Sequence, residues 1–168
     1  MSNQTLDHLS IIVAVAKNGA IGLNNQLLYR LPNDLKRFKA LTSGQTVLMG
    51  RKTLQTLPGG KGLPKRRNVV LTTDRDFVAE NVETVHTLAG AVFAAGADAF
   101  VIGGGSIYRQ MLPFCDTAYI TKVHVTPESD TFFPDLDKDP AWILAEVLQS
   151  GEENGIAYDI LLYRRKEN

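Results

Sequence analysis

Short runs rich in β-branched and apolar residues recur along this chain, and they constrain its fold more than any other feature. Stretches with helical spacing separate the earlier runs, so strand and helix alternate over the first two-thirds of the chain. Such alternation is typical of a mostly parallel sheet flanked by helices. We expect strands at Leu9–Ala16, Thr46–Met49, Asn68–Leu71, Phe100–Ile102, Ala118–Val125, Trp142–Leu148 and Ile156–Tyr163, and helices at Pro32–Leu41, Lys52–Leu57, Leu88–Ala95 and Ser106–Met111.

The last third of the chain follows a different pattern. Its final two strand-like runs meet across residues 150–155, which leaves no room for a crossover helix. These runs therefore predict an antiparallel hairpin at one end of the sheet. A chain of 168 residues is near the usual size of one domain, so we expect a single α/β domain over residues 1–168.

The charge balance excludes some classes of partner. Lys plus Arg number 18 and Asp plus Glu also number 18, so no net charge argues for a nucleic-acid or membrane-surface partner. Residues 1–8 lack the basic start and apolar run of a secretory signal, and no stretch has the ~18 apolar residues of a membrane span. We therefore expect a soluble cytoplasmic protein. The single cysteine, Cys115, is expected to be a buried packing residue.

Two turns share one design, in which a strand ends in glycine and a helix begins directly. They lie at Gly50 and at Gly103 to Gly105. Such turns suit phosphate, because the free amides of a helix start attract anions and glycine permits close backbone approach. Together they indicate a pyrophosphate, and hence a dinucleotide, although plain turn chemistry explains either one alone equally well. The Rossmann and Walker fingerprints are both absent. Candidates for binding a further phosphate, such as the ribose phosphate of NADPH, are Arg51, Lys52, Thr73 and Arg75.

A carboxylate interrupts an apolar helical stripe near Pro32. At about 100° per residue, one arc of the helix holds Leu31, Asp34, Leu35, Phe38 and Leu41. An acid there is unusual, because burying an unpaired charge is costly. A first-turn acid that complements the helix dipole is the alternative. The position inside the stripe favours function, since an acid beside Leu27, Leu35 and Phe38 suits the amidine-like edge of a flat, polar heterocycle.

Several segments, taken in order and spacing, resemble one known family. They are Ile21–Phe38, Met49–Thr53, Leu63–Asn68, Val101–Tyr108 and Asp130–Asp135. This series resembles dihydrofolate reductase, and the likeness extends from about Leu9 to the C-terminus. The resemblance implies an eight-stranded sheet and a cis peptide within Gly103-Gly104. It also implies a loop around Gly22–Leu28 that closes over the nicotinamide.

The resemblance also implies roles for individual residues. It assigns Asp34 to the pterin edge as a catalytic residue, with Leu27 and Tyr29 beside it, and Arg66 to the glutamate carboxylate of folate. Around the pterin or nicotinamide it implies Ile12, Val13, Leu35, Phe38, Thr53, Leu57, Ile102, Tyr108 and Thr121. Cofactor contacts carry over to Ala14, Ile21, Gly50, Arg51, Lys52, Thr53, Leu71, Thr72, Thr73, Ile102, Gly103, Gly104, Gly105, Ser106, Ile107 and Tyr108.

The chain departs from the family pattern at two places. Many bacterial members have proline and tryptophan where this chain has Leu28 and Tyr29, and the tryptophan helps to hold a water near the acid. We expect the Tyr29 hydroxyl to serve instead. Some relatives carry an arginine at the position of Ser106 that contacts the cofactor ribose phosphate. Lys52 and Arg75 are expected to compensate.

The resemblance implies a specific reaction, the NADPH-dependent reduction of 7,8-dihydrofolate to 5,6,7,8-tetrahydrofolate. A hydride would reach pterin C6 while N5 gains a proton, in a monomer with no metal. His8, His86 and His124 lack metal-ligand spacing and receive no role. One alternative is another pterin or pyrimidine reductase of this fold, against which Arg66 argues. The other is a non-catalytic nucleotide-binding module, which would not need Asp34 inside an apolar stripe.

Overall fold

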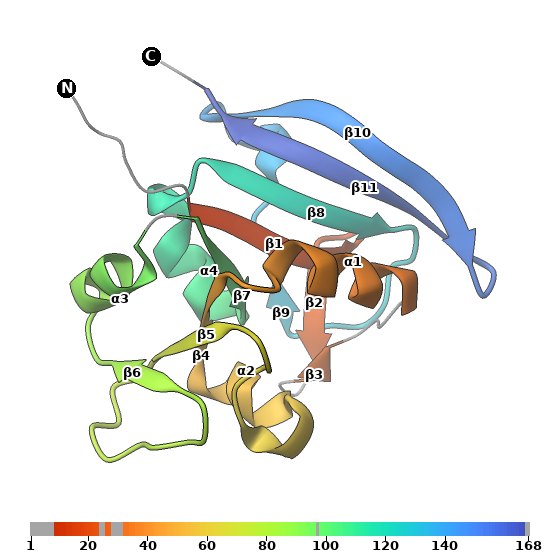
Figure 1. Ribbon diagram of the computed structural model, residues 1–168. Helices are drawn as coiled ribbons and strands as arrows, with labels where there is room; N and C mark the ends of the chain where they lie inside the picture. The colour runs from red at the N-terminus through yellow and green to blue at the C-terminus, as the bar shows by residue number, and fades with distance from the viewer. Residues whose placement is uncertain (1–8, 24–25, 28–31, 97, 167–168) are drawn as a thin grey trace.

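In the computed structural model, which describes residues 9–23, 26–27, 32–96 and 98–166, an eight-stranded sheet forms the centre of the molecule (Figure 1). Across the sheet the strands are β10 (Trp142–Glu153), β11 (Ile156–Arg165), β8 (Thr117–Val123), β1 (Leu9–Ala16), β7 (Ala99–Gly103), β4 (Thr46–Gly50), β5 (Arg67–Leu71) and β6 (Glu83–Val85). Strands β8 to β6 run parallel, whereas β11 is antiparallel to both β8 and β10. The predicted mostly parallel sheet with an antiparallel C-terminal hairpin is confirmed.

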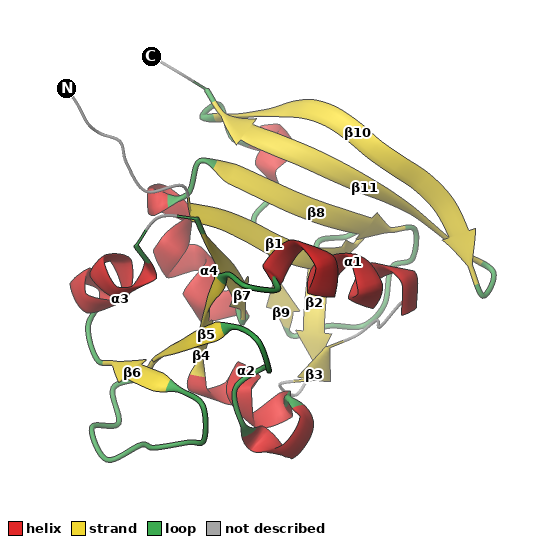
Figure 2. Cartoon of the chain, viewed as in Figure 1, coloured by secondary structure: helices red, strands yellow, loops and turns green. Residues whose placement is uncertain are grey.

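Helices cover both faces of this sheet (Figure 2). They are α1 (Pro32–Thr42), α2 (Arg51–Thr56), α3 (Leu88–Ala95) and α4 (Gly105–Met111), and short 3-10 turns occupy Pro58–Gly60, Leu112–Phe114 and Leu136–Lys138. A small second sheet contains β3 (Gln26–Leu27), β2 (Ala20–Leu23) and β9 (Thr131–Phe132). Within the described ranges, none of the helices combines the length and apolar character needed to cross a membrane.

The core lies on both sides of the central strands because side chains alternate along a strand. Leu48 of β4 belongs to the larger cluster, which includes residues of α3 and α4. Its neighbours Val47 and Met49 face the opposite way and pack with Leu54 of α2. All four side chains are fully buried. The two layers fix the helices against the sheet, so the strand ends are held in a defined arrangement.

Some elements were not predicted from the sequence. Strand β6 has only three residues, and the strands of the small sheet have two to four, so none of them shows a recognisable alternation. The predicted loop over residues 150–155 is also wrong, because β10 continues to Glu153. Only Asn154 and Gly155 connect the two strands, and both have positive φ, as in a two-residue type I′ hairpin turn.

The edge strand β10 is irregular. Its pairing with β11 shifts register between Leu144 and Glu146 and again between Val147 and Gln149. Such shifts mark β-bulges, which bend a strand and interrupt its hydrogen-bond ladder. Ile143, Leu144 and Val147 on this strand are exposed.

Arg165 ties the last strand to the segment that follows α4. Its Nε donates to the carbonyl oxygen of Cys115 at 2.9 Å, and its Nη2 donates to that of Leu112 at 2.7 Å. The guanidinium also lies 4.7 Å from the ring centroid of Trp142. Cys115 itself is 1% exposed, and burial raises the pKa of its thiol to about 12, so its predicted packing role is confirmed.

We expect Arg165→Met to lower the free energy of unfolding by about 2 kcal/mol, because two hydrogen bonds from a charged donor are lost. Urea denaturation measures the change. Arg164→Met is the matched control, since Arg164 is exposed, and its effect should stay within about 0.5 kcal/mol. Equal losses from both variants would contradict the structural role of Arg165.

Candidate active site

One cavity of about 1080 Å³ gathers nearly all of the predicted site residues. It is lined by the ends of strands β1, β4, β5 and β7 and by residues of α1, α2 and α4. The predicted residues that line it are Ile12, Val13, Ala14, Ile21, Asp34, Leu35, Phe38, Gly50, Arg51, Lys52, Thr53, Leu57, Arg66, Leu71, Thr72, Thr73, Ile102, Gly103, Gly104, Gly105, Ser106, Ile107 and Tyr108. In open α/β sheets ligands bind at the carboxyl ends of the strands, and this cavity has that position.

A few predicted residues are not in this lining. Thr121 is only 5% exposed and lies behind Asp34, to which its hydroxyl donates a hydrogen bond. Arg75, expected to help bind a phosphate, is not among the lining residues that the structure describes. The side chain of Leu27 and the whole of Tyr29 lie outside the described residues. Their proposed roles therefore stay predictions.

The two glycine turns lie side by side. Strands β4 and β7 are neighbours, with Met49 in register with Gly103, so the starts of α2 and α4 adjoin the same cavity. Gly103 has a φ of 123°, which only glycine adopts readily, and its peptide bond to Gly104 is cis, as the family resemblance implied.

The turns also leave no room for side chains. A methyl group at Gly50 would lie 2.8 Å from Cγ1 of Ile107, and one at Gly105 would lie 2.5 Å from Cγ2 of Thr131. Glycine therefore keeps bare backbone at this wall of the cavity. Arg51 and Lys52 follow the first turn and add positive charge. The arrangement suits a phosphate-containing ligand.

Asp34 lies in the first turn of α1 and faces the same cavity. Its Oδ1 accepts a hydrogen bond from Thr121 Oγ1 at 2.6 Å. Burial raises the pKa of Asp34, whereas the Thr121 hydrogen bond and the positive charge of Arg37 lower it, and the negative charge of Glu153 raises it. The net pKa is raised. Asp34 is thus a carboxyl of increased proton affinity, the kind of group that recurs at functional sites.

Leu35 and Phe38, the apolar neighbours of Asp34 on α1, line the cavity. Leu35 is 50% exposed, so its side chain is open to the cavity. Leu35 and Phe38 form part of the cavity wall, whose apolar surface is covered only when a ligand is bound. On the opposite side, the Tyr108 hydroxyl donates to the carbonyl oxygen of Ile12 at 2.7 Å. Burial raises the pKa of Tyr108, and the charge of nearby Asp34 raises it further.

Arg66 is held at another part of the cavity by two hydrogen bonds. Its Nε donates to Thr42 Oγ1 at 2.8 Å, and its Nη1 donates to the carbonyl oxygen of Pro64 at 3.0 Å. The guanidinium also lies 5.8 Å from the ring centroid of Phe38. The buried side chain of Asn68 supports this loop, since its amide donates to the carbonyl oxygen of Arg66. With this support the guanidinium still has donors to offer a carboxylate.

Two further cationic or titratable residues line the cavity although no sequence pattern singled them out. Nδ1 of His86 lies 2.9 Å from the carbonyl oxygen of Thr72. His86 directly follows β6, so recognising that short strand would have aligned it with Thr72 at the end of β5. Arg109 lies in the last turn of α4, and a methyl group at Gly105 would lie 3.6 Å from its Nη1. A single basic residue on a short helix carries no such signal.

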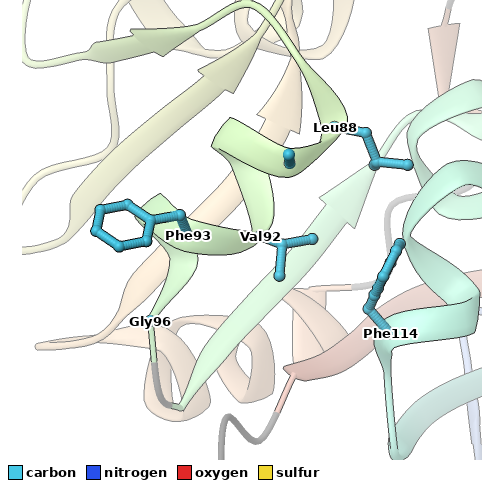
Figure 3. A pocket seen from close by; sticks show the side chains of 6 residues that line it. Leu88, Val92, Phe93, Gly96 and Phe114 are labelled. Atoms are coloured by element: carbon cyan, nitrogen blue, oxygen red, sulfur yellow. The ribbon is translucent and has the colours of Figure 1, made fainter.

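A second cavity, of about 680 Å³, lies between α3 and the turn after α4 (Figure 3). Leu88, Val92 and Phe114 converge on it, whereas Phe93 points away from Phe114. Its lining residues are all apolar or glycine. A ligand site needs a few placed polar groups to orient its ligand, and none of the residues lining this cavity has a polar side chain. In the described part of the chain, no three or more histidine, cysteine or acidic residues are grouped so as to hold a metal ion.

Comparisons with known proteins show which family this chain is similar to. The family model described as dihydrofolate reductase matches residues 8–165. The chain is 36% identical to the dihydrofolate reductase of Bacillus subtilis, covering 95% of this chain and 96% of that protein. It is 38% identical to the Staphylococcus aureus enzyme, covering 95% of this chain and 99% of that one. A solved dihydrofolate reductase from Enterococcus faecalis, complexed with NADP(H) and RAB-propyl, superposes with a TM-score of 0.83 at 36% identity, covering 95% of this chain and 97% of that one.

The fold and these relatives define an NADPH-dependent oxidoreductase. The chain belongs to the dihydrofolate reductase family. The enzyme class, the cofactor and the fold class expected from the sequence are thereby confirmed.

The raised pKa of Asp34 predicts that this residue lowers stability at neutral pH. The folded protein must bury the ionised carboxylate above the folded-state pKa, and this cost disappears below the unfolded-state pKa, where both states are protonated. Asp34→Asn should therefore be more stable than the wild type at neutral pH. Urea denaturation at a series of pH values should show this gain shrinking as the pH falls through the raised pKa.

Asp159→Asn is the matched control of opposite sign. Hydrogen bonds from Ser150 and His124 lower the pKa of Asp159, so its ionised form stabilises the fold above the unfolded-state pKa. That variant should lose stability at neutral pH, and its deficit should vanish as the pH falls through the lowered pKa. An Asp34→Asn protein less stable than the wild type at neutral pH would contradict the assigned burial cost.

Proposed function

We propose that this protein reduces 7,8-dihydrofolate to 5,6,7,8-tetrahydrofolate with NADPH, adding a hydride to C6 and a proton to N5 of the pterin ring. The observation that carries the proposal is Asp34, a largely buried carboxyl in the same cavity as two glycine turns. A module that only bound nucleotide would not need an acid there. We further propose that it acts as a monomer in the cytoplasm, with no metal, membrane or nucleic acid, which rests on its balanced charge and sequence.

The wall of bare backbone fits the cofactor. The proposed contacts to the phosphates and ribose of NADPH are the glycine turns with the residues that follow them, namely Gly50, Arg51, Lys52, Thr53, Gly103, Gly104, Gly105 and Ser106. Glycine leaves the backbone bare for close approach of a ligand, and larger residues at Gly50 or Gly105 would collide with their protein neighbours. When bound, NADPH supplies the hydride. The relative from Enterococcus faecalis, complexed with NADP(H), supports this assignment.

Asp34 is proposed to fix the pterin ring. An ionised carboxylate accepts two hydrogen bonds, here from the amino group and a ring nitrogen of the pterin. Its raised proton affinity strengthens these bonds and increases the proton affinity of the reacting edge. The apolar side chains of Leu35, Phe38 and Leu57 are proposed to cover the ring faces. Orientation of this kind is the main contribution of a protein whose cofactor performs the chemistry.

The proton for N5 is proposed to arrive through water. Asp34 binds the opposite edge of the ring in this scheme and need not reach N5 itself. Tyr29 and Leu27 are proposed to lie around this water, and their side chains lie outside the described residues. Thr121 holds Asp34 from behind and so helps to keep its carboxylate in one orientation.

Arg66 favours folate over a bare pterin as substrate. Its guanidinium is oriented by Thr42 and Pro64 and lines the cavity, so it is suited to grip the glutamate carboxylate of folate. A reductase of this fold acting on a small pterin or pyrimidine would have no use for this arginine. The direct assay mixes purified protein with NADPH and dihydrofolate and follows NADPH absorbance. Cofactor binding without turnover would overturn the proposed reaction.

Asp34→Asn should lower the single-turnover rate at neutral pH by about 10²-fold or more, because the amide keeps the size but loses the charge. Affinity for NADPH should hardly change. Activity should recover as the pH falls and dihydrofolate is protonated directly in solution. Asp159→Asn, a surface control, should match the wild-type profile. Superimposable profiles for Asp34→Asn and the wild type would remove Asp34 from the mechanism.

Arg66→Leu should raise the KM for dihydrofolate by about 10- to 100-fold, because a charged hydrogen-bond partner of the glutamate carboxylate is lost. NADPH affinity should not change, and a pterin substrate without the glutamate tail should react equally with variant and wild type. Arg67→Leu is the matched control, since Arg67 pairs with Glu83 at the surface. Equal weakening of both ligands by Arg66→Leu would contradict the assignment.

A further inference from the structure

A glutamate from the far end of the chain reaches the helix that carries Asp34. Glu153 is the last residue of β10, beside the hairpin turn, and both of its carboxylate oxygens lie 3.3 Å from the backbone nitrogen of Asn33. That N–H belongs to the first turn of α1, where amides lack partners within the helix. Asn33 immediately precedes Asp34. The hairpin therefore brings a negative charge to the turn that holds the candidate catalytic carboxyl.

An arginine on the same helix acts on Asp34 with a charge opposite to that of Glu153. Arg37 lies three residues further along α1, and residues with this spacing are neighbours on a helix. Its Nε is buried and has no hydrogen-bond partner among the described residues. A buried donor without a partner is costly, so hydrogen bonding by Nε within the described residues does not explain this placement of Arg37. The positive charge of Arg37 has a defined effect, because it lowers the pKa of Asp34.

We propose that Glu153 and Arg37 are positioning residues that act on Asp34 with opposite charges, so that the β10–β11 hairpin helps to set the protonation of the catalytic carboxyl. The inference rests on the proposed function, in which Asp34 binds the pterin. Neither residue needs to touch the substrate. Both charges lie at the first turns of α1. Glu153 accepts from the Asn33 amide at the start of the helix, and Arg37 is itself a residue of the helix.

Four residues in the described part of the chain interact with Asp34 by hydrogen bond or charge. Thr121 from β8 donates a hydrogen bond to it, and Tyr108 from α4 lies near enough for its pKa to be raised by the Asp34 charge. Arg37 on α1 lowers the pKa of Asp34, and Glu153 on β10 raises it. Among them, Arg37 and Glu153 are the two whose charges act in opposite directions.

Such a balance has a chemical purpose. Burial alone pushes Asp34 towards its neutral form, which would donate a hydrogen bond where the pterin edge requires an acceptor. Arg37 opposes that push and favours the ionised form. Glu153 raises the proton affinity again, which strengthens the hydrogen bonds that the carboxylate accepts. The two charges therefore act on Asp34 in opposite senses: Arg37 favours the ionised form, and Glu153 strengthens the hydrogen bonds which that form accepts.

The experiment measures the pKa of the Asp34 carboxyl by carbon-13 NMR in the ligand-free protein, and in parallel the pH profile of dihydrofolate reduction. Glu153→Gln should shift the pKa downwards, Arg37→Gln should shift it upwards, and the double variant should lie between the two. The midpoint of the activity profile should move in the same directions. The matched controls are Glu152→Gln and Lys36→Gln, which remove exposed charges from neighbouring positions and should leave both readouts unchanged.

A third variant separates charge from hydrogen bonding. Glu153→Gln keeps an acceptor for the Asn33 amide, whereas Glu153→Ala removes it. Equal downward shifts in both support the charge effect, and a shift in the alanine variant alone overturns it. The proposal also fails if Glu152→Gln shifts the pKa as far as Glu153→Gln does. Because NMR needs no substrate, the expected pKa shifts without any dihydrofolate turnover would refute the proposed reaction and leave the action of the two charges on Asp34 supported.

Discussion

The parallel pairing of β4 with β7 is the constraint on which the site depends. Because Met49 lies in register with Gly103, both strands end at the same level, and both continue directly into a helix. The glycines at those ends keep side chains away from the shared space. Most of the other candidate site residues line the same cavity as this bare backbone. Helix α1 covers a neighbouring part with Asp34, and the loop before β5 supplies Arg66 at another.

The site also illustrates why an active centre lowers stability. Asp34, Arg37 and the half-exposed Leu35 all lie in α1, and each departs from what a structural helix would contain. A helix evolved for stability alone would have an apolar residue in place of the acid and no buried donor without a partner. The sheet compensates, since most side chains of its central strands are buried in the two core layers. The buried sheet thus offsets the unfavourable residues of α1.

Much of this arrangement could be predicted from the sequence, because it depends on local patterns. Strand β1 and helix α3 have the predicted bounds, and the glycine turns and Asp34 were found from spacing alone. Contacts between distant segments could not be found that way. Asn33 and Glu153 are 120 residues apart, and Arg66 and Thr42 are 24 apart. Periodicity alone cannot distinguish a side chain facing the core from one facing a ligand cavity, so the 50% exposure of Leu35 comes from the structure.

The irregular edge strand has a consequence for the behaviour of the protein at high concentration. Strand β10 is long, lies at the border of the sheet and exposes Ile143, Leu144 and Val147. A regular edge with such side chains would be a template for strands of other molecules. The two register shifts interrupt the regular row of backbone amides and carbonyls along β10, and bulges of this kind also bend and twist a strand. The bulges therefore make β10 a poor edge for pairing with another molecule. A variant with a regular β10 would lose solubility before it lost catalytic activity.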